Sequence, residues 1–140
     1  MVVAAALSAH VSPVAAESCL TDDSPGGGGL SSGFDALNCG SSVAIGNDTT
    51  ALGSQAGALG TGTTAIGSES GTSFGGGDYN TFTGYRSGNT LGSGSGNTFF
   101  GAGSGEGFGA LSGAADNNTA IGANAGAGVN GSGNFAAGAQ

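Results

Sequence analysis

Between Val43 and Gly67 the chain repeats one short phrase every seven residues. Each copy places alanine before a branched aliphatic residue and glycine after it, and the four copies end in Ile45-Gly46, Leu52-Gly53, Leu59-Gly60 and Ile66-Gly67. A short period that recurs without interruption is typical of repeat architectures, and it constrains the fold more than the local propensity of any one segment.

A seven-residue period also occurs in coiled coils, which require helix-forming residues and charged flanking positions. Here every phrase contains glycine, and glycine inside a helix costs about 1 kcal/mol relative to alanine. The alternative is a strand of three or four residues that ends at a glycine bend, because glycine readily adopts the positive φ of a sharp corner. Two strands then form one coil of fourteen residues, and successive coils stack at a spacing of about 4.8 Å. The sequence therefore predicts an all-β fold, a parallel β-roll or β-solenoid.

Alternate residues of a strand point to opposite faces, so each phrase has one face inside the coil. We expect the large apolar residue of each phrase to be the buried one, together with its equivalents later in the chain. This expected core consists of Ile45, Leu52, Leu59, Ile66, Leu91, Phe100 and Ile121.

After Gly67 the phrases begin with Asn-Thr and lie further apart, which indicates coils of roughly sixteen or seventeen residues. Aromatic residues appear in the same region, because a wider coil needs bulkier side chains to fill it. Side-chain amides at equivalent corners of stacked coils hydrogen-bond to one another as ladders. We expect such a ladder to contain Asn80, Asn89 and Asn97.

The phrases S-V-A-I-G, T-A-L-G and T-T-A-I-G, spaced by sevens between Ser42 and Ser70, resemble the head repeats of YadA-like trimeric autotransporter adhesins. The Asn-Thr-x-x-Gly series, best preserved from Asn118 as N-T-A-I-G-A-N-A-G, is similar to repeats of phage tail-fibre and other surface-fibre proteins. The resemblance implies a left-handed β-roll, association as a trimer and a place on a bacterial surface.

The amino-acid composition limits the kinds of partner that the chain can bind. Glycine accounts for 33 of the 140 residues, and the formal net charge is −8 with Arg86 as the single Lys or Arg. Such a chain has no electrostatic basis for binding phosphate backbones or anionic membranes. We expect no nucleic-acid partner and no membrane insertion.

The chain divides into three segments. Residues 1–16 are mildly apolar and shorter than the roughly 20 residues of a membrane span, and they form either a capping strand or short helix at the end of the roll or an arm that packs on a neighbouring subunit. Residues 17–41 are a glycine-rich loop with both cysteines, for which a Cys19–Cys39 disulfide is the simplest use in an extracellular protein, and two free buried thiols are the alternative. Residues 42–140 form the solenoid domain.

Groups for catalysis are scarce. His10 is the single histidine, and the glycine-rich runs lack the lysine and the strand-to-helix context of a phosphate loop. Asp78 or Asp116 could bind a single calcium ion, and the alternative is that neither aspartate binds metal. Three Asn-x-Ser/Thr triplets either accept glycans in a secretory setting or reflect a composition rich in these residues. They begin at Asn47, Asn117 and Asn130.

These features predict a protein that is not an enzyme, needs no cofactor or metal and works outside the cell or on its surface. The leading hypothesis is a self-assembling β-solenoid subunit of a fibre or surface filament, with this chain itself as the partner. The alternative is a trimeric adhesin head that binds a host or matrix surface. An ice-binding solenoid comes third, with Val43 and Phe135 counting against a threonine column. The column would contain Thr50, Thr64, Thr81, Thr90 and Thr98.

Overall fold

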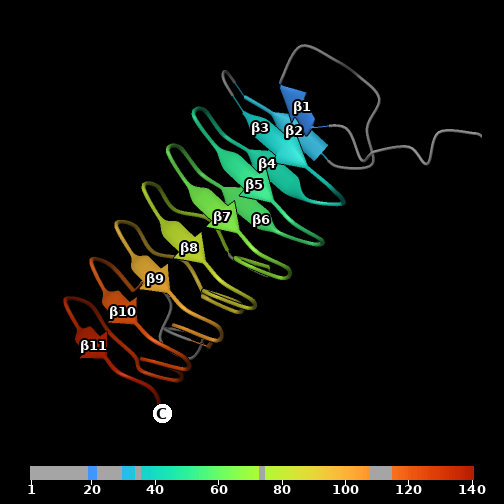
Figure 1. The fold of residues 1–140 in the computed structure, drawn as a ribbon. Coiled ribbons are helices and arrows are strands. Elements are labelled where there is room, and N and C mark those ends of the chain that lie inside the picture. The colour runs from blue at the N-terminus through green and yellow to red at the C-terminus, as the bar shows by residue number, and fades with distance from the viewer. Residues whose placement is uncertain (1–18, 22–29, 34–35, 73–74, 108–114) are drawn as a thin grey trace, which may run out of the picture.

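The computed structural model describes residues 19–21, 30–33, 36–72, 75–107 and 115–140, and these residues form a β-solenoid of about six turns (Figure 1). The first sixteen residues, with His10, lie outside the described ranges, as does most of the glycine-rich loop. The expected all-β fold of short parallel strands is confirmed. The strands are β1 (Cys19–Thr21), β2 (Leu30–Ser32), β3 (Leu37–Cys39), β4 (Val43–Ile45), β5 (Thr50–Leu52), β6 (Gly57–Leu59), β7 (Thr64–Ile66), β8 (Thr81–Thr83), β9 (Thr98–Phe100), β10 (Thr119–Ile121) and β11 (Phe135–Ala137).

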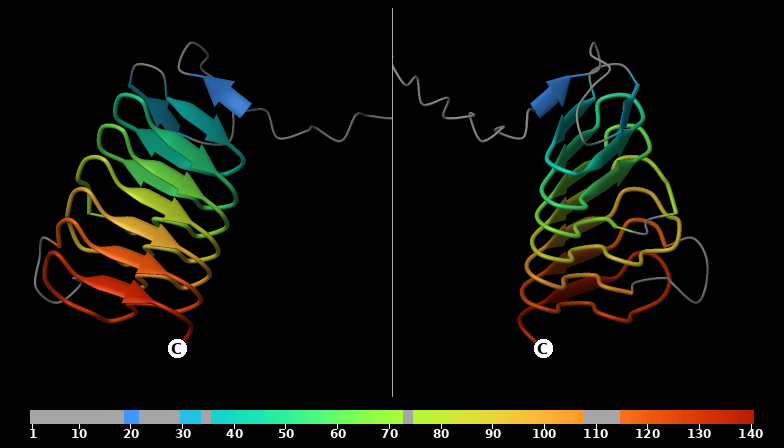
Figure 2. Two further views of the ribbon diagram at one scale, coloured as in Figure 1. Left: turned by 60° about the vertical axis from the view of Figure 1, so that its left-hand side comes forward. Right: turned by 90° about the vertical axis from the view of Figure 1, so that its right-hand side faces the viewer.

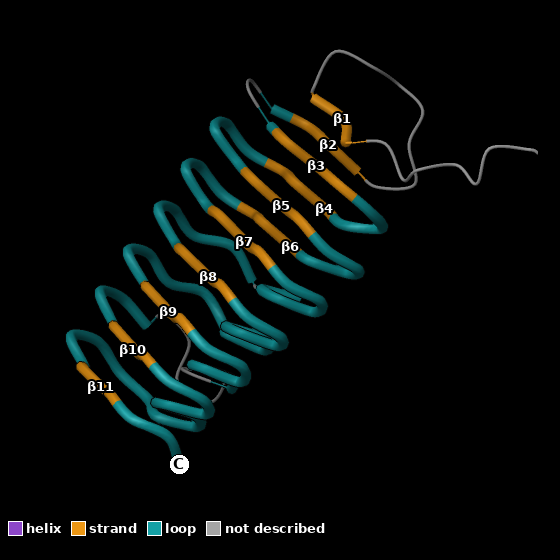
Figure 3. The backbone as a smooth tube through the Cα atoms, viewed as in Figure 1, coloured by secondary structure: helices purple, strands orange, loops and turns teal. Residues whose placement is uncertain are grey.

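The strands make two walls of the solenoid. Wall A is the eight-stranded sheet in the order β1-β3-β5-β7-β8-β9-β10-β11, and wall B is the three-stranded sheet β2-β4-β6. All pairs are parallel except β1 with β3, which is antiparallel. Figure 2 shows the strands of wall A lying one below another along the whole stack. Beyond β6 the opposite side of the coils is formed by loops (Figure 3).

The register of wall A measures how long each coil is. Thr50 pairs with Thr64, fourteen residues on, and Thr64 pairs with Thr81, seventeen residues on. The following coils contain seventeen, twenty-one and sixteen residues. The coils therefore widen after β7, as the spacing of the phrases indicates.

The expected core is wrong for most of its members. In the seven strands β4 to β10 the middle residue points inward and is fully buried; these residues are Ala44, Ala51, Ala58, Ala65, Phe82, Phe99 and Ala120. The middle residue of β3 is the buried Asn38, and that of β11 is the partly buried Ala136. The large residue that follows points outward: Ile45 and Ile66 are each 38% exposed, Phe100 is 59% exposed and Ile121 is 46% exposed. Leu52 and Leu59 are partly buried, and Leu91 alone is fully buried.

Coil width explains this exchange of faces. A fourteen-residue coil brings its two walls so close together that a methyl group fills the space between them, so alanine occupies the inner position. Because side chains alternate, an inward alanine requires the isoleucine or leucine beside it to face outward.

Two of the wider coils hold phenylalanine at the same inner position, in β8 and β9, whereas β10 has Ala120 there. The rings of Phe82 and Phe99 stack with centroids 5.7 Å apart and an interplanar angle of 29°. Glycines line the space around them, since a Cβ on Gly88 would lie 2.5 Å from the Phe82 ring and one on Gly105 would lie even closer to Phe99. Bulkier interior side chains thus accompany the wider coils, although Phe99 rather than Phe100 is the inner residue.

The glycine that ends each phrase is required by the corner. Gly84 has a φ of +130°, and a Cβ there would lie 2.5 Å from the carbonyl oxygen of Gly101 in the next coil. Side chains are excluded both by the backbone conformation and by the close approach of the neighbouring chain. The periodic glycine in the sequence therefore marks where the backbone of one coil touches the next.

Candidate functional site

The outer face of wall A carries two parallel columns of side chains. One column begins the strands and consists of Thr50, Thr64, Thr81, Thr98 and Thr119, paired in register. The other column ends the strands and consists of Leu52, Ile66, Thr83, Phe100 and Ile121. We call this surface the outer face; Leu37 and Phe135 occupy the threonine position in β3 and β11.

The threonine column differs from the expected one in two respects. Thr90 is not part of it and lies in a corner, whereas Thr119 continues it. Val43 does not interrupt it, because Val43 lies in β4 of wall B. The five threonines are therefore consecutive along the stack.

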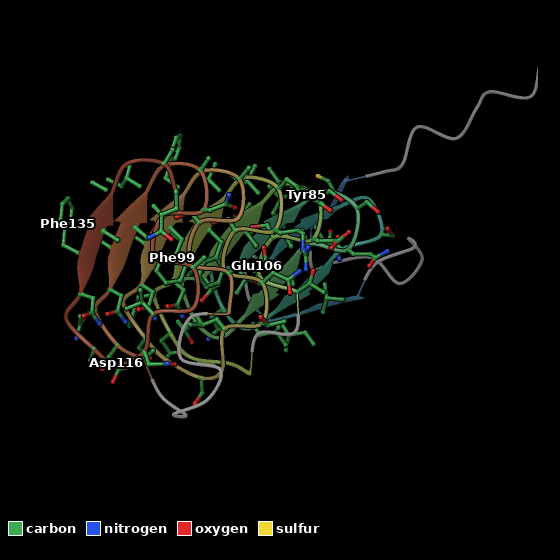
Figure 4. The ribbon with its side chains drawn as sticks, turned by 90° about the horizontal axis from the view of Figure 1, so that it is seen from below. Tyr85, Phe99, Glu106, Asp116 and Phe135 are labelled. Atoms are coloured by element: carbon green, nitrogen blue, oxygen red, sulfur yellow. The ribbon has the colours of Figure 1, made fainter. Side chains whose placement is uncertain are left out.

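Apolar groups are exposed along the second column. Ile66, Phe100 and Ile121 expose between 38% and 59% of their surface. Phe135, which ends the neighbouring threonine column, exposes 72%. Figure 4 contrasts Phe99, which lies within the coils, with Phe135 outside them. Thr83 separates Ile66 from Phe100, so the exposed apolar groups recur along the column without forming one unbroken strip. Exposed apolar side chains that gather on one face mark interaction surfaces.

Charge is absent from this face. None of the strands β3, β5, β7, β8, β9, β10 and β11 contains an acidic or basic residue. The charged residues that the structure describes lie in the corners and connecting segments. Arg86 is one of them: its Nη2 lies 2.7 Å from a carboxylate oxygen of Glu106, and its Nε lies 3.5 Å from Glu69. The single cation is thus used within the corner and does not serve the outer face.

A ladder of buried asparagines supports the entry to wall A. Asn97 donates from its backbone nitrogen and from Nδ2 to Oδ1 of Asn80, each over 3.0 Å. Asn118 donates in the same way to Asn97, and Asn134 to Asn118. Asn89 lies outside this ladder, because it is located in a different corner of the coil. Asn118 and Asn134 are additional members of the ladder beyond those expected, and both begin the same Asn-containing phrase.

A column of buried serines supports the wall from inside. The hydroxyls of Ser70, Ser87 and Ser104 donate to the carbonyls of Phe82, Phe99 and Ala120, over 3.2, 3.0 and 2.8 Å. Each bond joins one coil to the middle of a strand in wall A. Because buried polar groups that are fully paired rigidify a structure, both polar columns hold the outer face in one geometry.

The two aspartates considered for calcium are part of a third ladder. Asp78 accepts a hydrogen bond from the backbone nitrogen of Thr61 over 2.8 Å, and Asp116 accepts one from Ser95 over 2.8 Å. They lie two coils apart. Within the described ranges no group of three His, Cys, Asp or Glu side chains gathers as a metal site would require.

The cysteines lie opposite one another in the backbone ladder of β1 and β3, where Cys19 pairs with Cys39. Directly opposed residues of an antiparallel pair have Cα atoms about 4.5–5.5 Å apart, which falls within the range that a disulfide spans. The Cys19–Cys39 disulfide stays a prediction that this register supports.

Among the described residues no helix is long and apolar enough to cross a membrane. Comparisons of the chain with family models, with curated proteins and with solved structures give no match. The resemblance to adhesin heads and fibre repeats therefore stays an expectation.

Proposed function

We propose that this chain is a non-enzymatic extracellular structural protein, a β-solenoid subunit that associates with copies of itself through the outer face of wall A. One observation carries the proposal. The face is uncharged and regular along the stack, and one of its two columns exposes apolar side chains at Ile66, Phe100 and Ile121.

Electrostatics favours a second copy as the occupant of this face. The chain carries a net charge of −8, so two copies repel one another over most of their surfaces. The outer face is where two acidic molecules meet without opposing carboxylates. A basic partner would instead be drawn to the acidic corners, where Asp48, Asp78 and Asp116 lie.

Shape favours the same occupant. The short side chains of the threonine column form a shallow row beside the taller row that contains Ile66, Phe100 and Ile121. The tall row of one copy fits over the short row of another, and each contact buries apolar surface worth about 25 cal/mol per Å². Because this contact repeats along the stack, several weak contributions to the free energy of association add together.

The proposed place outside the cell rests on the resemblance to surface proteins and on the opposed cysteines, because disulfides persist in oxidising compartments. Closed trimers and extended fibres are both forms of such an assembly. The trimer corresponds to the adhesin-head alternative, with a host or matrix surface as a further partner.

The experiment compares the wild-type protein with the double variant Ile66→Asp/Phe100→Asp by sedimentation velocity over a range of concentrations. Both positions are exposed, so the variant is expected to keep its circular dichroism spectrum and to sediment as a monomer. Tyr79→Asp is the matched control, since Tyr79 is 69% exposed but lies in a corner away from the outer face, and it should assemble like the wild type.

A wild-type protein that stays monomeric at all concentrations would overturn the proposal, as would a double variant that assembles normally. Electron microscopy of the wild-type assembly then separates short closed particles, which support the trimeric head, from long filaments, which support the fibre.

The consecutive threonines favour ice binding as a second candidate function. Their hydroxyl and methyl groups repeat at the strand spacing of about 4.8 Å on an uncharged face, and Val43 no longer counts against them. Phe100 and Phe135, which stand out beside the column and at its end, argue against a flat ice-binding surface. Thermal hysteresis by the wild type that is lost in Thr81→Tyr would support this function, and its absence in the wild type would exclude it.

A further inference from the structure

Asn130 and Gly131 lie in the segment that leads into β11, and they form the single Asn-Gly pair of the chain. Asn130 is exposed, and its side chain makes no hydrogen bond within the described part of the chain. Gly131 has a φ of +95°, and the nearest atom to a Cβ placed there would be Nδ2 of Asn134 at 3.9 Å. A side chain at position 131 would therefore meet open space, and glycine leaves that space unfilled.

The chemical stability of an asparagine side chain depends on the backbone nitrogen of the residue that follows it. An unhindered nitrogen attacks the side-chain amide carbon, whereas a nitrogen whose N–H donates a hydrogen bond is held in place. Gly131 donates no such bond within the described ranges.

The nitrogens that follow most other asparagines are held. In the ladder, the nitrogens of Thr81, Thr98 and Thr119 donate to carbonyls of the next coil over 2.8, 2.8 and 2.9 Å. The same is true in the corners, where Thr90 donates to Thr72 over 3.0 Å and Ala125 donates to Gly122 over 3.3 Å.

Exposure alone does not distinguish Asn130. Asn117 is also exposed, but the nitrogen that follows it belongs to Asn118 and donates to Oδ1 of Asn97 over 3.0 Å. Asn47 and Asn134 precede Asp48 and Phe135, and any residue with a Cβ hinders approach to its nitrogen more than glycine does. Asn130 is the case in which exposure, an unbonded nitrogen and a missing Cβ coincide.

We propose that Asn130–Gly131 is a site of spontaneous covalent modification, at which the folded protein converts asparagine to aspartate and isoaspartate. The Gly131 nitrogen gives its proton to water and bonds to Cγ of Asn130. Nδ2 takes up a proton from water, the Cγ–Nδ2 bond breaks, and ammonia leaves as the five-membered imide forms. Water then opens the imide at one of its two carbonyls. Opening at the backbone carbonyl yields isoaspartate, and opening at the side-chain carbonyl yields aspartate, without any change of oxidation state.

Conversion to isoaspartate affects the attachment of β11. It lengthens the main chain by one carbon immediately before Ser132 and Asn134, which join this coil to the preceding one. Ser132 accepts from the backbone nitrogen of Asp116 over 2.9 Å, and Asn134 donates to Asn118 over 2.8 Å from its backbone nitrogen. Displacement of this segment weakens both hydrogen bonds. The coil that contains β11 therefore becomes less firmly attached as the modification accumulates.

The test incubates the folded wild-type protein in neutral buffer and follows each asparagine by peptide mass spectrometry. Asn130 is expected to convert roughly tenfold or more faster than Asn117, because a hydrogen bond worth about 1.4 kcal/mol corresponds to a factor of ten. The variant Asn130→Gln, whose longer side chain does not close a five-membered ring, should show no conversion at this position.

Two further measurements make the outcome decisive. In the denatured chain the other asparagines should speed up while Asn130 changes little, since the fold protects them and not Asn130. Hydrogen exchange at the Thr119 amide, which donates to the carbonyl of Asn134, should be faster in the converted protein. Conversion at Asn117 that equals or exceeds conversion at Asn130 in the folded protein would overturn the proposal.

Discussion

Replacing Phe99 with alanine tests the assignment of the inner and outer faces most directly. Phe99 is fully buried, its ring stacks on Phe82 at 5.7 Å, and Gly105 lies so close that a Cβ there would clash with the ring. Truncating a buried phenylalanine costs about 3–5 kcal/mol. Because glycine backbone lines the pocket and contributes no side chain to fill a cavity, we expect a loss of about 4 kcal/mol.

The neighbouring residue supplies the matched control. Phe100 has the same side chain in the same strand but is 59% exposed on the outer face. Truncating an exposed strand residue changes stability by less than about 1 kcal/mol. The interpretation in which Phe100 belongs to the core predicts the opposite order.

Urea unfolding followed by far-ultraviolet circular dichroism measures both changes. The variants are compared in an Ile66→Asp background at one protein concentration, so that self-association does not contribute to apparent stability. Equal m-values allow the shift in midpoint to be converted into a free-energy difference. If Phe100→Ala costs as much as Phe99→Ala, the assignment of the two faces is wrong.

Other predictions address the corners, the ladders and the cysteines. Gly84→Ala should destabilise the protein by about 2–4 kcal/mol in the same urea assay, because both its φ and the contact with the next coil exclude a side chain. Asn97→Ala should cost about 3 kcal/mol, since several buried partners lose their hydrogen bonds. Asn117→Ala on the exposed corner should cost only about 1 kcal/mol, because Asn117 has a φ of 57° that alanine adopts less readily than asparagine. Thr90→Asn should raise the thermal midpoint, because Thr90 has a φ of 58°, which a β-branched residue adopts at a cost of about 1–2 kcal/mol; an unchanged or lower midpoint would contradict this. The intact mass under non-reducing conditions should lie about 2 Da below the reduced mass if Cys19 and Cys39 are joined, and alkylation of both thiols would exclude the bond.

Much of the architecture follows from the sequence alone. The period of seven, with glycine at each corner, excludes helices and predicts short parallel strands stacked in coils. The lengthening of the period predicts wider coils with larger side chains inside, and the structure has Phe82 and Phe99 there. These conclusions depend on backbone conformation and on chain length per coil, both of which a sequence records directly.

The direction of each side chain was decided by the tertiary structure. A strand of period two offers two faces, and the pattern Thr-Ala-Ile is compatible with isoleucine inside or alanine inside. The distance between the two walls selects alanine, and that distance results from how the coils close in three dimensions. Because Ile66 and Phe100 are the larger apolar residues, hydrophobicity alone selects the wrong face.

The membership of the polar ladders is a tertiary property for the same reason. Asn80, Asn89 and Asn97 begin similar phrases, yet only Asn80 and Asn97 share a column, which continues to Asn118 and Asn134. Stacking aligns residues that lie one full coil apart, and here that distance varies from sixteen to twenty-one residues. The sequence determines that asparagines occupy corners, and the number of residues in each folded coil determines which of them meet.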